Sequence, residues 1–254
     1  MRNSVQSVNR ALTILEMLSK HPNGLGVTEI AHEMDVAKST VHRLLSSLLS
    51  YDFVSKDPNS HYYKLGLKLL YLGNEVSKSL DIRSVSLPFL KKLSQQTGET
   101  VHLAIYDQGE VVYIEKIESS ALLRMYSQIG IRAPAHCTGL GKAILSQKSE
   151  QEIDDFIHTK GLHQFTDNTL TTKTALMKAL RDAKALGYAY DDEEHERGIR
   201  CAASPIFNFR NEVIGAISVA GPTTRITEEK LKELCTQVKK IAIDISTAMG
   251  MTRK

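Results

Sequence analysis

The spacing of apolar residues near the start of the chain predicts three helices. Apolar side chains recur at helical spacing from about residue 5 to 20, and a Pro-Asn-Gly turn then breaks the pattern. We expect Thr28 to cap a short second helix, and we expect a third helix over residues 38–50. The third helix carries one apolar stripe, which consists of Val41, Leu44, Leu45, Leu48 and Leu49.

A β-hairpin is expected directly after the third helix. Aromatic and β-branched residues occur at positions 52–56 and 61–65, and a turn-rich Asp-Pro-Asn-Ser tetrapeptide separates them. Helix, short helix, tight turn, helix and hairpin is the order of a winged helix-turn-helix. The pattern therefore predicts a DNA-binding domain over residues 1–66.

The next stretch, residues 67–80, is expected to form a linker helix. Four apolar residues recur on roughly one of its faces: Leu69, Leu72, Val76 and Leu80. Such a stripe suits packing against a second copy of the chain, and it suits ordinary packing within the chain equally well.

The remaining residues, 81–254, have the pattern of an α+β domain. Helices are expected at residues 82–97, 141–147, 150–158, 173–186 and 227–249. Strands are expected at residues 100–106, 111–117, 122–127, 199–207 and 213–220. Tight hairpins between strands, with helices grouped in the middle, favour an antiparallel sheet covered by helices.

The outer face of the third helix has the chemistry that a major-groove helix needs. No acidic residue lies between Val36 and Tyr51. Arginine can pair bidentately with guanine, and hydroxyl and lysine side chains serve phosphates. A solvated polar face is the alternative for this helix taken alone, but the neighbouring wing favours DNA. The expected DNA contacts are Lys38, Ser39, Thr40, His42 and Arg43 on the helix, with Lys56, Asn59 and His61 in the wing.

Composition narrows the class without identifying it. The chain is 42% hydrophobic and 24% charged, which is typical of a globular protein. Net charge is +3, and residues 1–66 hold seven basic and six acidic residues, so charge alone does not establish DNA binding. Three well-separated cysteines, with neither a signal peptide nor an apolar run long enough to span a membrane, predict a cytoplasmic protein with no membrane partner.

A glycine-containing motif, residues 136–142, precedes an expected helix and is a candidate anion site. Glycine lets the backbone approach a ligand closely, and a helix start offers N–H donors to a carboxylate. A phosphate-binding P-loop is excluded, because the motif has His136 and Ala143 where glycine and Ser/Thr are required. The alternative is a helix cap with close packing.

Several segments together resemble the IclR family of bacterial regulators. They are residues 4–12 (SVQSVNRAL), 38–45 (KSTVHRLL), 63–66 (YKLG), 139–142 (GLGK), 198–205 (GIRCAASP) and 221–222 (GP). The resemblance covers essentially the whole chain. It implies a winged-helix domain, a linker helix and a GAF-like effector domain. It also implies homodimers that often pair into homotetramers, with double-stranded operator DNA as a partner. The chain has no compact Cys/His/Asp or Ser/His/Asp motif, so we expect no enzymatic activity.

The resemblance also implies an effector site for a small organic acid. Residues corresponding to Asp191, Cys201 and Ser218 contact the effector in this family, whereas Ala220 replaces a serine found in some relatives. Residues 123–130 resemble repressors that respond to 2-keto-3-deoxygluconate, although Arg124 within them has a surface ion pair as its alternative. The expected effector contacts are Gly139, Leu140, Gly141, Asp191, Cys201, Ser218 and Arg124.

Other kinds of site are weighed against this interpretation. A metal could use His136, Cys137 and Cys201, but the motif lacks a close-spaced ligand pair. An enzyme could use a cysteine nucleophile beside His136 or His195, and a protein adaptor could use the winged helix as a scaffold. We expect no catalytic residue, no metal and no cofactor. The acidic run at residues 191–196 is expected to be mostly a solvated loop.

Overall fold

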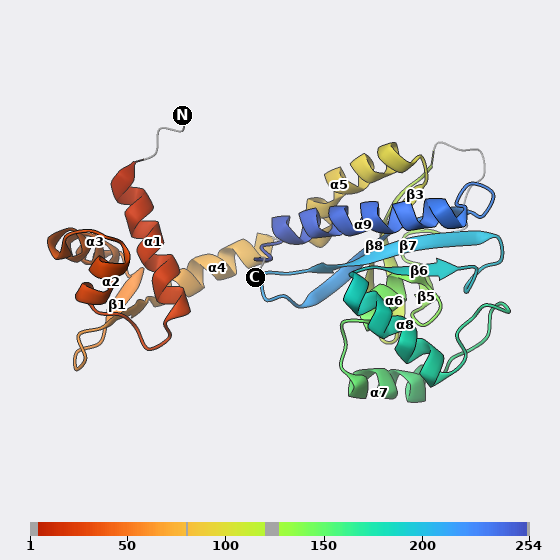
Figure 1. The fold of residues 1–254 in the computed structure, drawn as a ribbon, viewed down its shortest axis with the longest axis horizontal. Helices are drawn as coiled ribbons and strands as arrows, with labels where there is room; N and C mark the ends of the chain where they lie inside the picture. Colours follow the sequence, from red (N-terminus) through yellow and green to blue (C-terminus); the bar gives the residue numbers. More distant parts are fainter. Residues whose placement is uncertain (1–4, 80, 120–126, 253–254) are drawn as a thin grey trace. The chain divides into compact units, whose positions relative to one another are not determined.

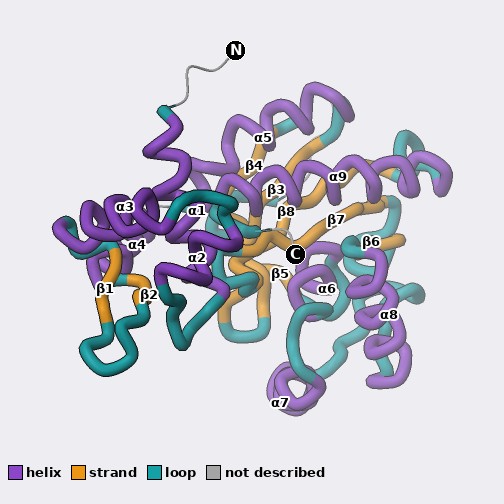
Figure 2. The backbone as a smooth tube through the Cα atoms, turned by 60° about the vertical axis from the view of Figure 1, so that its left-hand side comes forward, coloured by secondary structure: helices purple, strands orange, loops and turns teal. Residues whose placement is uncertain are grey.

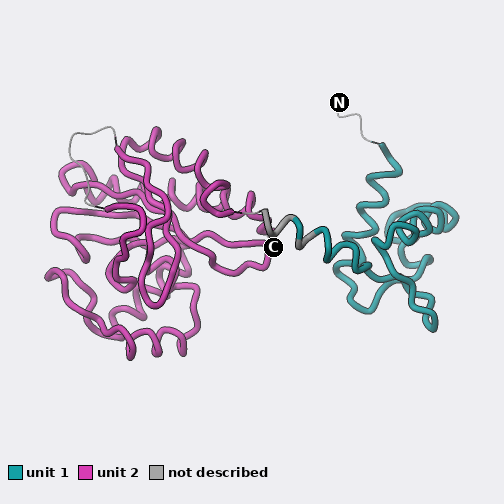
Figure 3. The backbone as a smooth tube through the Cα atoms, turned by 180° about the vertical axis from the view of Figure 1, so that it is seen from behind, with its two compact units in different colours: residues 1–80 teal, residues 81–254 magenta. Residues whose placement is uncertain are grey.

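The computed structural model describes residues 5–79, 81–119 and 127–252, which belong to two compact units (Figure 1). The units comprise residues 1–80 and 81–254 and are coloured separately in Figure 3. Each has its own hydrophobic core, so each is described by itself.

The first unit is a winged helix-turn-helix, as predicted. Its elements are α1 (Gln6–Lys20), α2 (Val27–Glu33), α3 (Lys38–Ser50), β1 (Val54–Lys56), β2 (Tyr63–Leu65) and α4 (Leu67–Ser79). The two strands pair antiparallel, with Val54 opposite Leu65. Ile14, Ile30 and Leu45 are fully buried where the three helices meet.

Two local predictions for this unit are wrong. Thr28 lies inside α2 and does not cap it. The N-cap is Gly26, whose amide donates to Glu29 Oε2 at 2.7 Å. Leu49 is 39% exposed, because it lies at the edge of the apolar stripe centred on Val41 and Leu45.

The second unit contains an antiparallel sheet, as predicted. Its strands are β3 (Thr100–Asp107), β4 (Glu110–Ile117), β5 (Arg132–Pro134), β6 (Ala189–Asp192), β7 (Ile199–Phe207) and β8 (Val213–Pro222). They form one six-stranded sheet in the order β5-β4-β3-β8-β7-β6, in which all neighbours are antiparallel. The short strands β5 and β6 were not predicted. Of the strand expected at 122–127, residues 122–126 lie outside the described part, and Ser127 belongs to no strand.

Helices cover both faces of this sheet (Figures 1 and 2). They are α5 (Ile82–Thr97), α6 (Gly139–Leu145), α7 (Glu150–Lys160), α8 (Lys173–Leu186) and α9 (Glu228–Ala248). Helices α5 and α9 pack together on one face, while α6 packs on the other between the sheet and α8. Every residue of α6 is buried, so the start of this helix lies directly against β7 and β8.

Candidate functional site

The proposed DNA-contacting residues lie on the surface of the first unit. On α3, Lys38, Ser39, His42 and Arg43 are exposed, and Thr40 is partly buried. In the wing, Lys56, Asn59 and His61 are exposed. A groove between α2, α3 and the wing is lined by residues that include His42, Lys56 and His61. The fold thus brings part of the predicted set together, and the other five residues lie outside that groove.

The turn of the wing is held by its own side chains. Asp57 Oδ1 accepts hydrogen bonds from the amides of Asn59 and Ser60, both at 2.9 Å, and these bonds lower the pKa of Asp57. His61 has a positive φ of 61°, and Lys56 Nζ lies 5.5 Å from the centroid of the Tyr63 ring. A turn fixed in this way presents Asn59 and His61 in one conformation.

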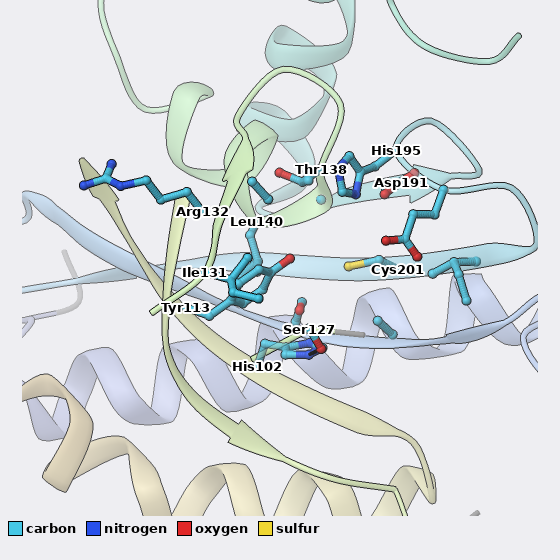
Figure 4. A pocket seen from close by; sticks show the side chains of 16 residues that line it. His102, Tyr113, Ser127, Ile131, Arg132, Thr138, Leu140, Asp191, His195 and Cys201 are labelled. Carbon is cyan, nitrogen blue, oxygen red and sulfur yellow. Dashed lines mark hydrogen bonds between the residues drawn. The ribbon is translucent and has the colours of Figure 1, made fainter. Parts of the chain in front are cut away.

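In the second unit, five of the predicted effector residues line one cavity of about 170 Å³ (Figure 4). It lies between the start of α6 and the sheet. The five residues come from separate parts of the chain: Gly139, Leu140, Asp191, Cys201 and Ser218. We call this space the effector cavity.

Gly141 lies outside this lining. Its amide already donates to Thr138 Oγ1 at 3.2 Å, which leaves it no free donor for a ligand. A Cβ at this position would lie 2.2 Å from the carbonyl oxygen of Ala135. These contacts favour close packing of backbone on backbone at Gly141, which was the alternative for this motif, over the expected effector contact. Arg124 lies outside the described residues.

Asp191 and Ser218 are buried polar groups of the cavity wall. Asp191 is 5% exposed, and its Oδ1 accepts the amide of Glu194 at 2.7 Å. Burial raises the pKa of Asp191 to about 7, against the opposing charge of Lys142. Ser218 is fully buried, and within the described part of the chain its hydroxyl has no nitrogen or oxygen partner; the weak thiol of Cys201 is beside it. An orphaned buried hydroxyl in a cavity wall is a position where a ligand can supply the partner.

The other polar groups of the lining are imidazoles, hydroxyls, the guanidinium of Arg132 and the exposed carboxylate of Glu196. His102 Nε2 lies 2.7 Å from Ser127 Oγ, and burial lowers the pKa of His102 to about 3. Burial also lowers the pKa of His195. The side chain of Arg132 points away from the cavity (Figure 4), and it forms ion pairs with Asp107 and Glu110. Among the described lining residues, the cavity therefore has no cation without an acidic partner.

The cysteines do not have the properties of nucleophiles. Burial raises the pKa of both Cys137 and Cys201, and it raises that of Cys235 to about 12, so all three are thiols near neutral pH. The hydrogen bond of His136 is with neither cysteine, because its Nε2 donates to the carbonyl oxygen of His163 at 2.9 Å. Within residues 5–79, 81–119 and 127–252, no group of three or more His, Cys, Asp and Glu residues could hold a metal.

Several polar residues of the cavity were not among the expected effector contacts: His102, Tyr113, Ser127, Thr138, His195 and Glu196. His102 is opposite Ser218 in the β3–β8 register, so a correct strand pairing would have located it. Thr138 is the N-cap of α6, which a Ser/Thr residue before a helix signals. His195 and Glu196 carried no such signal within the acidic run.

The acidic run, residues 191–196, is not the solvated loop that was expected. Asp191 and Glu194 are buried, with exposed fractions of 5% and 6%. Asp192 forms an ion pair with Arg200 at 2.6 Å, and Glu193 Oε2 accepts the amide of Gly198 at 2.7 Å. Each of these acids has a structural partner, and the segment that they stabilise forms one wall of the cavity.

An exposed winged helix joined to an α+β unit that contains a cavity defines a class: two-domain, DNA-binding transcription regulators. The comparisons agree. Residues 7–58 match the model of the IclR helix-turn-helix domain, and residues 74–247 match that of the C-terminal domain of bacterial IclR transcriptional regulators. The chain belongs to the IclR family.

Individual relatives resemble the chain over nearly its whole length. The transcriptional regulator XynR of Escherichia coli is 38% identical over 97% of this chain and 98% of its own. The acetate operon repressor of Salmonella typhimurium is 36% identical over 98% of this chain and 92% of its own. The crystal structure of the Agobacterium tumefaciens repressor BlcR has a TM-score of 0.84 and 25% identity, and covers 99% of this chain and 100% of that one.

The C-terminal domain of E. coli KdgR, also solved, is 33% identical with a TM-score of 0.61, and covers 67% of this chain and 99% of that domain. In the described part of the present chain, no helix is long and apolar enough to cross a membrane.

Proposed function

We propose that the protein is a repressor of sugar-acid catabolism that leaves its operator when a small keto acid, such as 2-keto-3-deoxygluconate, binds the effector cavity. The observation that carries this proposal is the cavity itself. It gathers the start of α6, the buried acid Asp191 and the unpartnered hydroxyl of Ser218 around a space of about 170 Å³. A space below the usual 300–1,000 Å³ or so of drug-sized sites suits a small metabolite.

The lining suits a guest with several hydroxyl groups. Asp191 accepts hydrogen bonds, the hydroxyl of Ser218 donates or accepts, and the neutral ring of His102 has both a donor and an acceptor nitrogen. These groups support a hydroxylated acid, in agreement with the resemblance of residues 123–130 to repressors of that type.

The carboxylate of such a guest fits the start of α6. Gly139 and Leu140 are the first two residues of this helix, so their amides have no carbonyl partner within it. The carboxyl groups of Asp191 and Glu196 both line the cavity, and each repels the carboxylate of the guest when it is ionised. The pKa of Asp191 is raised to about 7, so this residue is half protonated near neutral pH, which reduces its share of the repulsion.

The repressor half of the proposal rests on the relatives. The Salmonella and Agobacterium proteins are both named repressors, and the present chain shares their two-unit organisation. We propose that homodimers or homotetramers bind operator DNA through Arg43 and the other exposed residues of α3 and the wing. Glyoxylate, pyruvate or an aromatic acid is the alternative effector, and it would use the same cavity.

Calorimetric titration of the full chain with 2-keto-3-deoxygluconate, pyruvate and glyoxylate tests the proposal. Ser218→Ala should weaken binding of the effector by about tenfold, because it removes a hydrogen bond of about 1 kcal/mol or more. Ser86→Ala on α5 is the matched control, since its hydroxyl is also buried and unpartnered but lies away from the cavity. If only pyruvate or glyoxylate binds tightly, that acid replaces 2-keto-3-deoxygluconate as the proposed effector. Binding that Ser218→Ala leaves unchanged would place the effector elsewhere.

A further inference from the structure

Two different segments form opposite walls of the effector cavity. One is the start of α6, with Gly139 and Leu140, and the other is the end of β6 and the turn after it, with Asp191 and His195. An ion pair between Lys142 and Glu194 joins them. Neither of these two side chains lines the effector cavity, although each lies within three residues of one that does.

The Lys142–Glu194 pair is buried. The two side chains are 5% and 8% exposed, and Lys142 Nζ contacts Glu194 Oε1 directly. Lys142 Nζ also lies 5.7 Å from the centroid of the Tyr190 ring. Glu194 Oε2 is buried and has no partner in the described part of the chain. The stability of a buried, ionised carboxylate depends strongly on its paired cation, here Lys142.

The backbone of Glu194 is fixed on its other side. Its amide donates to Asp191 Oδ1 at 2.7 Å. Its carbonyl oxygen accepts hydrogen bonds from Thr169 Oγ1 at 2.6 Å and from Thr166 Oγ1 at 3.2 Å. Glu194 therefore connects Asp191 and the loop at residues 166–169 to helix α6. A shift of Glu194 would move Asp191 through the hydrogen bond that they share.

Space is available for such a shift. A second cavity of about 320 Å³ lies between α6, β6 and α8, and Lys142, Tyr190 and Glu194 are part of its lining. Without the attraction of Lys142, the Glu194 side chain could turn toward this space. Close packing therefore does not hold the Glu194 side chain on this side, and the ion pair with Lys142 adds to the backbone hydrogen bonds that hold the segment.

We propose that Lys142 and Glu194 are positioning residues for the effector site: they set the separation of its two walls without touching the ligand. The proposal rests on the proposed function, since it assigns the effector to that cavity. It gives the lysine of the Gly-Leu-Gly-Lys motif a role distinct from anion binding, because its charge is directed to Glu194 and away from the effector.

The test uses the full chain with both charges removed together, Lys142→Met with Glu194→Leu. Apolar replacement of a buried pair keeps the fold, whereas removal of one partner leaves an uncompensated charge. The matched control is Lys230→Met with Glu233→Leu, which removes an exposed ion pair of 2.9 Å on α9. Amide hydrogen exchange is measured without ligand, and affinity for 2-keto-3-deoxygluconate, pyruvate and glyoxylate is measured by calorimetry.

We expect faster exchange confined to residues 191–198, and effector binding weakened by at least about tenfold, with the control unchanged. Unchanged exchange at residues 191–198 would overturn the proposal. Faster exchange throughout the sheet would also overturn it, because the pair would then support the fold as a whole. If the wild type binds none of the three acids, the proposed effector is wrong, and the exchange pattern still decides the role of the pair.

Discussion

Two glycines near the start of α6 have different surroundings, and alanine substitutions should separate packing from ligand binding. At Gly141 an added Cβ would lie 2.2, 2.3 and 2.5 Å from three backbone atoms of Ala135. At Gly139 it would lie 3.0 Å from Cys201 Sγ and 3.3 Å from Ala203 Cβ. The backbone of Ala135 cannot rotate away from a methyl group, whereas at Gly139 the closest atom, Cys201 Sγ, belongs to a side chain that can rotate, and the contact with Ala203 is longer.

The expected magnitudes follow from these contacts. Overpacking costs about 1–3 kcal/mol or more, and alanine in place of a helical glycine returns up to about 1 kcal/mol. The closest contacts at Gly141 are with backbone, so Gly141→Ala should lower the free energy of unfolding by about 2 kcal/mol or more. Gly139→Ala should remain within about 1 kcal/mol of the wild type. Its methyl group would narrow the effector cavity, so effector binding should weaken.

Urea unfolding followed by circular dichroism, together with calorimetric titration of the effector, measures both quantities on each variant. The reasoning predicts that Gly141→Ala loses stability and that Gly139→Ala loses mainly effector affinity. A Gly141→Ala protein as stable as the wild type but unable to bind the effector would refute it. That result would restore Gly141 as a ligand contact.

Three further predictions concern DNA binding, pH and assembly. Arg43→Ala should weaken operator binding by about 1–3 kcal/mol in an anisotropy titration. It should leave the free energy of unfolding unchanged, since the side chain is exposed, and the control Lys20→Ala should leave operator binding unchanged. Equal operator affinities of Arg43→Ala and the wild type would contradict the contact. The pKa of Asp191 is about 7 in the folded chain against an ordinary 3.8, so this residue lowers stability progressively as pH rises between these values. The free energy of unfolding of Asp191→Asn should therefore rise relative to the wild type from about pH 4 to 7, and a constant difference would exclude the shift. Footprinting should show paired half-sites separated by whole turns of about 34 Å, and a monomer with full operator affinity would contradict this.

The long elements could be predicted from the sequence because their signals are local. The bounds of α3, α5 and α8 agree with the expected residues, and α5 shows why. Asp81 caps it by accepting the amides of Arg83 and Ser84, and Gly98 ends it with a φ of 71°. Strands β5 and β6, by contrast, have only three and four residues, so their pairing depends on neighbours that are distant in sequence.

The site was less predictable, because its features depend on contacts between elements. A glycine motif does not show whether a ligand or a carbonyl group approaches it, and at Gly141 it is the carbonyl of Ala135. The sequence of an acidic run does not show which of its members is buried. Glu194 is buried with a cation from another element, Lys142 of α6, as its ion-pair partner. The meeting of His102 with Ser218 follows from the register of β3 against β8.

The central claim is that a small acid bound in the second unit controls DNA binding by the first. The most direct test is an anisotropy titration of the full chain on an operator selected from random duplexes, at fixed salt, with and without 2-keto-3-deoxygluconate. We predict tight binding that the keto acid weakens by about 5- to 150-fold, the usual range of coupling between two sites. Operator affinity that stays the same with 2-keto-3-deoxygluconate, pyruvate and glyoxylate would contradict the account.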